Sequence, residues 1–86
     1  MLKISFKSSF VREVNKLDRN LAEELFDKIE LFKSIENHTK LKVHKLHGRL
    51  SGCYSFSVNY KTRIVFEYES KDSVTLLDIG DHDIYR

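Results

Sequence analysis

The chain has 86 residues, of which 41% are hydrophobic and 33% are charged, and its formal net charge is +2. This length and hydrophobic content exclude a disordered chain, so we expect residues 1–86 to form one domain with a single core. No apolar run is long enough to span a membrane, the first residues lack the features of a signal peptide, and the single cysteine, Cys53, excludes an internal disulfide. We therefore expect a cytoplasmic protein.

Charge is distributed unevenly along the chain. Residues 1–63 contain 13 Lys and Arg against 7 Asp and Glu, whereas residues 64–86 contain 2 against 6. A basic body with an acidic tail favours a localised site for a polyanion. Charge alone does not decide this, because the same counts fit ordinary solvated side chains.

The N-terminal part of the chain predicts a strand followed by a short helix. Apolar and polar residues alternate from residue 2 to residue 6, which is the period of a half-buried strand. Ser8 or Ser9 is the expected N-cap of the following helix, because a serine oxygen can accept a hydrogen bond from an unpaired backbone N–H group. The helical spacing of apolar residues ends near Leu17.

A longer helix is predicted from residue 21 to about residue 35. Asn20, with Glu23 three residues later, resembles a capping box at its start. The opposite face mixes acidic residues with lysines, so we expect this helix to cover a sheet rather than to bind nucleic acid. Its apolar stripe comprises Leu21, Ala22, Leu25, Phe26, Ile29, Phe32 and Ile35.

The rest of the chain predicts strands. They are expected at 41–46, 53–60, 63–68 and 74–79, with a hairpin turn at 61–62. The order is therefore one strand, two helices and then three or four strands. It predicts an α+β domain in which the two helices pack on one face of a mainly antiparallel, four-stranded sheet, in the order β-α-α-β-β-β.

The alternation along these strands predicts which side chains are buried. Tyr54, Tyr60 and Tyr68 fall in the apolar register, so we expect them in the core or in cross-strand packing. The other register carries small or polar side chains and predicts a partly covered, concave binding surface. Its members are Cys53, Ser55, Ser57, Asn59, Arg63 and Glu67.

Two histidines carry the candidate chemistry. His44 lies in a basic segment, and an imidazole can be a neutral base near neutral pH. His82 follows a glycine near the C-terminus. A single histidine is more often structural or simply exposed. The functional interpretation depends on both imidazoles reaching one arginine, Arg63.

This combination suits cleavage of RNA without a metal ion. The reaction needs a base for the ribose 2′-OH, a cation for the charge that develops on the phosphate and an acid for the leaving 5′ oxygen. The planar fork of Arg63 can bond two phosphate oxygens. Lys42, Lys45 and Arg49 are candidates for binding flanking phosphates, although they equally fit solubilising charge. Tyr85 could stack on a base or hold a phosphate.

Other chemistry is less well supported by the pattern. His44 and His47 are three residues apart on a predicted strand and would face opposite ways, so we expect no metal site and no cofactor. His38 and His47 are expected to be exposed. Cys53 fits a small residue in a strand better than a catalytic thiolate, which would need a nearby base.

The motifs together resemble the RelE/ParE superfamily of bacterial type II toxins, and most closely its YafQ- and YoeB-like mRNA interferases. The similarity follows the order of elements along nearly the whole chain, and its specific motifs lie in residues 41–86. They are HKLHG at 44–48, LSGCYS at 50–55, RIVF at 63–66 and LDIGDH at 77–82, followed by Tyr85.

The resemblance implies a small, ribosome-associated endoribonuclease that cleaves mRNA and inhibits translation. It also implies a cognate antitoxin, a short basic or amphipathic chain that forms a hetero-oligomer with the toxin and blocks the basic pocket. The residues and the resemblance together predict His44 as the base, Arg63 on the scissile phosphate, His82 as the acid and Tyr85 in substrate orientation, with Lys45 in support.

Two other functions stay open. The ParE branch has the same scaffold and poisons DNA gyrase without the acid and base residues. The third possibility is a module that binds RNA or the ribosome and does not cleave.

Overall fold

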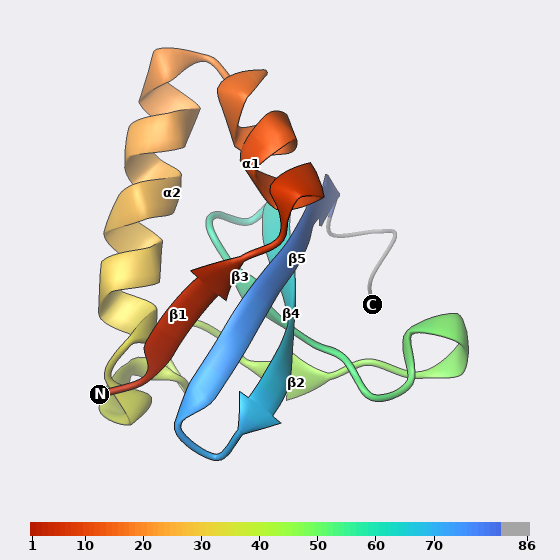
Figure 1. Cartoon of the computed structure of the whole chain (residues 1–86). Helices are drawn as coiled ribbons and strands as arrows, with labels where there is room; N and C mark the ends of the chain where they lie inside the picture. Colours follow the sequence, from red (N-terminus) through yellow and green to blue (C-terminus); the bar gives the residue numbers. More distant parts are fainter. Residues whose placement is uncertain (82–86) are drawn as a thin grey trace.

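The computed structural model describes residues 1–81 and contains five strands, two α-helices and two short 3-10 helices (Figure 1). The predicted α+β class is confirmed. The strands are β1 (Lys3–Phe6), β2 (His44–Lys45), β3 (Tyr54–Ser57), β4 (Thr62–Ser70) and β5 (Ser73–Asp81). The helices are α1 (Ser8–Asn15), α2 (Arg19–Phe32), η1 (Ile35–Asn37) and η2 (Gly48–Leu50).

The strands form one sheet in the order β1-β5-β4-β3-β2, which places β1 and β2 at opposite edges. Within residues 1–81, only β1 and β5 pair in parallel, so the sheet is mainly antiparallel as predicted. It has five strands rather than four, because two residues of the predicted strand at 41–46 pair with β3. Leu41 and Lys42 belong instead to a turn, in which their amides donate to the carbonyls of Asn37 and Thr39.

Helix α2 closes the core over one face of the sheet (Figure 1). Its buried residues are Leu25, Ile29 and Phe32. The Phe32 ring stacks on Phe56 of β3, with 4.2 Å between ring centroids, and meets Phe66 of β4 edge-on at 4.7 Å. Burying each such side chain contributes about 1.5–3 kcal/mol, so this stripe holds the helix on the sheet.

Two members of the predicted apolar stripe are exposed. Phe26 is 49% exposed, and Ile35 is 67% exposed because α2 ends at Phe32 and Ile35 begins η1. The predicted helix was therefore too long at its C-terminal end.

Both predicted helix caps were wrong. The N-cap of α1 is Lys7 and makes no side-chain capping bond, while Ser8 is already the first helical residue. The N-cap of α2 is Asp18, whose Oδ1 accepts the backbone N–H of Leu21 at 2.9 Å. Asn20, the predicted cap, lies inside the first turn of the helix.

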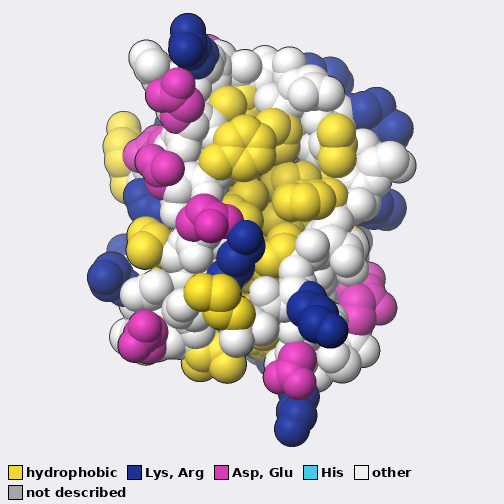
Figure 2. Space-filling view, turned by 60° about the vertical axis from the view of Figure 1, so that its left-hand side comes forward, with side chains coloured by type: hydrophobic (Ala, Val, Ile, Leu, Met, Phe, Trp, Pro, Cys, Tyr) yellow, Lys and Arg dark blue, Asp and Glu magenta, His cyan; other side chains and the backbone are white. Residues whose placement is uncertain are grey.

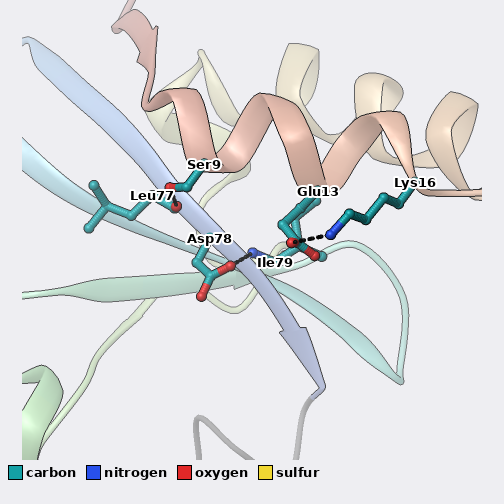
Figure 3. A network of polar contacts seen from close by, with 6 residues as sticks. All are labelled: Ser9, Glu13, Lys16, Leu77, Asp78 and Ile79. Carbon is teal, nitrogen blue, oxygen red and sulfur yellow. Dashed lines mark hydrogen bonds and ion pairs between the residues drawn. The ribbon is translucent and has the colours of Figure 1, made fainter.

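Helix α1 crosses strand β5 (Figure 3). Phe10 is its buried residue, and the hydroxyl of Ser9 donates to the carbonyl of Leu77 at 3.4 Å. A hollow of about 250 Å³ lies at this contact, on the face of the sheet that carries Val65. Phe10 belongs to the same core as the buried residues of α2, so both helices pack against the sheet, as predicted.

The β3–β4 turn lies earlier in the chain than predicted. Strand β3 ends at Ser57, and the Asn59 side chain accepts the amides of Lys61 and Thr62, both at 2.8 Å. Tyr60 therefore sits in the turn and is 91% exposed, against the prediction of a core position. Strand alternation predicts burial only where the chain remains in the sheet.

The other two tyrosines follow the prediction. The rings of Tyr54 and Tyr68 meet edge-on across β3 and β4, with 5.1 Å between centroids. They extend the aromatic packing that Phe66 begins in the core.

Apolar side chains also gather on the surface beside α2, as Figure 2 shows. We call this surface the apolar face; its exposed side chains are those of Phe6, Val11 and Phe26. One hollow of about 210 Å³ lies between the helices, and a second of about 440 Å³ runs between β1 and α2; both are lined by Phe6 and Phe26. The apolar residues that line the first hollow are Phe6, Phe10, Val11, Val14 and Phe26. Among the described residues, no helix is long and apolar enough to cross a membrane.

Candidate active site

Arg63 is the centre of the candidate site. It is the second residue of β4, where its neighbours in the sheet are Ser57 on β3 and Gly80 on β5. Alternation directs its side chain to the face opposite the core, as predicted. That face is more closed than predicted, because the side chain of Arg63 is only 2% exposed and that of Ser55 is fully buried.

The Arg63 guanidinium is held by hydrogen bonds on several sides. Its Nε donates to Ser55 Oγ and its Nη1 to Ser57 Oγ, both at 3.0 Å, and its Nη2 donates to the Lys42 carbonyl at 3.0 Å. Burial lowers the pKa of the guanidinium from its ordinary value. An arginine nevertheless stays charged in proteins, so the site contains a fixed, nearly buried cation.

His44 lies directly against this cation. Its Nδ1 is 3.1 Å from Arg63 Nη2 and 3.1 Å from the Lys42 carbonyl oxygen. His44 belongs to β2 and its side chain is exposed. The imidazole therefore lies between the buried guanidinium and the solvent. The structure thus brings together His44 and Arg63, two of the three groups that were predicted to meet.

The other three basic candidates all have exposed side chains but lie in different elements. Lys45 follows His44 in β2 and is exposed, and Arg49 is exposed in η2. Lys42 touches Arg63 through its backbone carbonyl. Its side chain is exposed, and its backbone has φ of +58°.

Two predicted residues, His82 and Tyr85, lie outside the described residues. The last described residue, Asp81, is paired with Thr62, which immediately precedes Arg63.

Ser55 and Ser57 were not predicted as functional residues. Their signal was present, because both occupy the same strand register as Arg63 in the sequence. Small hydroxyl side chains opposite an arginine in a hairpin are suitable acceptors for its N–H groups. The Lys42 carbonyl carried no such signal, since every residue has one.

The remaining histidines and the cysteine have other environments. His38, predicted to be exposed, is half-buried: its ring stacks on Phe32 and its Nε2 lies 2.8 Å from the Phe32 carbonyl oxygen. His47 is exposed, as predicted. Burial, followed by the charge of Glu67, raises the pKa of the Cys53 thiol, which disfavours a reactive thiolate. Within residues 1–81, no group of three or more His, Cys, Asp or Glu side chains could hold a metal ion.

Comparison with solved structures defines the fold. It is the α+β fold of the RelE- and YoeB-type toxin structures, which confirms at the level of fold the resemblance found in the sequence. No family model and no curated protein matches the chain in sequence.

Three solved structures illustrate the similarity. The RelE–RelB complex from Pyrococcus horikoshii OT3 has a TM-score of 0.72 at 15% identity, covering 93% of each chain. The YoeB–YefM toxin–antitoxin complex from Staphylococcus aureus has a TM-score of 0.71 at 17% identity, covering 95% of this chain and 98% of that one. The protein HP0894 from Helicobacter pylori has a TM-score of 0.72 at 20% identity, covering 96% and 97%.

Proposed function

We propose that this chain is the toxin of a type II toxin–antitoxin system and that it cleaves mRNA on the ribosome, in the cytoplasm, without a metal ion. Its fold is that of RelE- and YoeB-type structures. The observation that carries the proposal is the contact of 3.1 Å between the exposed imidazole of His44 and the buried guanidinium of Arg63. A base and a cation side by side are two of the three groups that the reaction needs.

His44 is the proposed general base. Its Nδ1 faces Arg63 and the Lys42 carbonyl, so its other ring nitrogen, Nε2, is the atom to take the proton from the ribose 2′-OH. The 2′ oxygen then attacks the adjacent phosphorus, the bond to the 5′ oxygen breaks, and a 2′,3′-cyclic phosphate forms.

The role of Arg63 differs from the one expected from sequence. The guanidinium already donates to two serine hydroxyls and a carbonyl. It therefore acts on the phosphate from its buried position next to His44 and does not bind two phosphate oxygens directly. A charge in a site of low dielectric acts more strongly over several ångströms than a charge in water. Arg63 therefore stabilises the negative charge on the phosphate and holds the base in position.

The remaining roles fall to residues around this pair. His82 is the proposed acid and Tyr85 orients the substrate. Support comes from the chain path, since β5 ends at Asp81 beside Thr62, one residue from Arg63. Lys45, next to His44, and Arg49 are proposed to bind flanking phosphates, which an exposed cation can do at low cost.

The proposed partner is a cognate antitoxin. The RelE–RelB and YoeB–YefM structures are complexes, each of which contains a chain with this fold. The apolar face supports a protein partner for this chain as well, because Phe6, Val11 and Phe26 are each exposed by 44–49%. Contiguous apolar surface of this kind marks protein interfaces. The second hollow follows β1, an edge strand, so an apolar segment of the antitoxin could pack along it.

Cleavage of a translated message tests the proposed activity. Purified protein is added to ribosomes translating a defined mRNA in their usual magnesium buffer, and primer extension maps the breaks. We expect discrete cuts with 2′,3′-cyclic phosphate ends, and a loss of about 100-fold or more in His44→Ala and Arg63→Ala, as for removal of a general base or of a charge-stabilising group.

His47→Ala is the matched control, since it removes an exposed imidazole three residues away and should cut normally. Inhibition of gyrase supercoiling without RNA cleavage would instead support the ParE-like function. Ribosome binding with no cuts at all would support a binding module.

A further inference from the structure

Lys42 has an unusual backbone for its residue type. Its φ of +58° makes it the one non-glycine residue with a positive φ among residues 1–81. This left-handed conformation is unfavourable for a residue with a Cβ atom, and such residues persist only where the surrounding structure holds them.

The surrounding structure does hold this turn on both sides. The Lys42 amide donates to the Thr39 carbonyl at 3.1 Å, and the Val43 amide donates to the His38 carbonyl at 3.0 Å. His38 in turn stacks on the core residue Phe32. The backbone around Lys42 is therefore attached to the core through His38.

The conformation aims the Lys42 carbonyl at both functional groups. Its oxygen is 3.0 Å from Arg63 Nη2 and 3.1 Å from His44 Nδ1, and these two nitrogens are 3.1 Å apart. The three atoms thus form a nearly equilateral triangle, and the proton positions within it decide which His44 nitrogen is free to act as a base.

Geometry favours a proton on Nδ1. If Nδ1 were unprotonated, Nη2 would have to donate to the carbonyl and to Nδ1 at an angle of about 60°, although its two N–H bonds diverge by about 120°. If Nδ1 carries the proton, Nη2 and Nδ1 both donate to one carbonyl oxygen, which has two lone pairs and accepts over a broad range of directions.

We propose that Lys42 is a positioning residue that acts through its main-chain carbonyl, which fixes His44 in the tautomer protonated on Nδ1 and leaves Nε2 to accept a proton. The consequence for cleavage depends on the proposed function, whereas the tautomer is a property of the free protein. The side chain of Lys42, predicted from sequence to bind phosphate, is dispensable in this arrangement.

Three substitutions separate the backbone from the side chain. Lys42→Gly and Lys42→Asn both remove the charge but accept a positive φ. Lys42→Val removes the same charge and opposes a positive φ, because its side chain is β-branched. Lys40→Val is the control, since it places the same residue on an exposed neighbour with an ordinary φ.

The first readout is the ¹⁵N NMR spectrum of histidine-labelled protein at alkaline pH, where the imidazole is neutral. We expect Nδ1 of His44 to show the shift of a protonated ring nitrogen and Nε2 that of an unprotonated one, in the wild type, Lys42→Gly and Lys42→Asn. In Lys42→Val, the opposite tautomer should appear. A wild-type spectrum with the proton on Nε2 overturns the proposal, whether or not the protein cleaves RNA.

The second readout is cleavage on translating ribosomes, with kcat and KM measured separately. Lys42→Gly and Lys42→Asn should keep kcat within about threefold of the wild type, whereas Lys42→Val should lose roughly tenfold or more, as for a displaced catalytic group. Equal losses in all three, confined to KM and reduced by added salt, would assign the effect to the side-chain charge and overturn the proposal. If Lys42→Val does not fold, the Gly and Asn variants still decide between these outcomes.

Discussion

At the scale of single residues, the position of the Arg63 guanidinium depends on its two serine partners. Removing a group that bonds a buried polar atom costs more than the bond itself, because the atom left behind has lost both water and its partner. Ser55 is the more critical of the two serines, since it is completely buried whereas Ser57 is half-buried.

We therefore predict that Ser55→Ala lowers the free energy of unfolding by about 1–3 kcal/mol, since it leaves Arg63 Nε without its acceptor. Urea denaturation followed by circular dichroism measures this, and the cleavage assay should show a parallel loss. Ser51→Ala, at an exposed turn position, is the control and should change stability by less than about 0.5 kcal/mol. Equal stability of the two variants would contradict the described hydrogen bond.

At the scale of elements, α2 depends on where its first turn is capped. The cap is Asp18 rather than the predicted Asn20. Asp18 Oδ1 accepts the N–H of Leu21, and a carboxylate there also faces the positive end of the helix dipole.

We expect Asp18→Ala to destabilise the protein by about 1 kcal/mol, the usual cost of losing an N-cap. Asn20→Ala should be neutral or slightly stabilising, because Asn20 lies inside the helix, where alanine has the better propensity. The pair is compared by thermal unfolding. A larger loss of stability in Asn20→Ala than in Asp18→Ala would instead support the capping box predicted from the sequence.

At the scale of the whole molecule, two surfaces lie at opposite edges of one sheet. His44 belongs to the edge strand β2, and the apolar face adjoins the edge strand β1. Binding of the proposed antitoxin at the apolar face can therefore be changed without touching the proposed catalytic residues.

Phe26→Glu tests this separation. It places a charge in the middle of the apolar face, so we expect the variant to fold and arrest growth as before but to escape rescue by the antitoxin, which can be selected from a genomic library against the wild-type protein. Ile35→Glu is the matched control, because Ile35 is also exposed and apolar but lies outside this face. Rescue of both variants alike would exclude the apolar face as the antitoxin surface.

The sequence predicted elements better than their ends. Hydrophobic periodicity correctly indicated β1, both helices and the packed positions of Tyr54 and Tyr68. It failed where the chain leaves regular structure, at the caps of α1 and α2, at Tyr60 and in the turn before His44. A cap or a turn depends on one or two hydrogen bonds, and several neighbouring residues can supply them.

By itself, the sequence determined the α+β class, the face of β4 that carries Arg63 and the position of His44 beside a basic segment, because strand alternation follows directly from residue order. Only the tertiary structure decided that Arg63 is nearly buried, that Ser55 and Ser57 bond it, and that the Lys42 backbone meets both it and His44. These contacts join residues up to 21 positions apart in the chain. They arise because the fold brings β2, β3 and β4 side by side and places the turn at Lys42 against them, which no local pattern encodes.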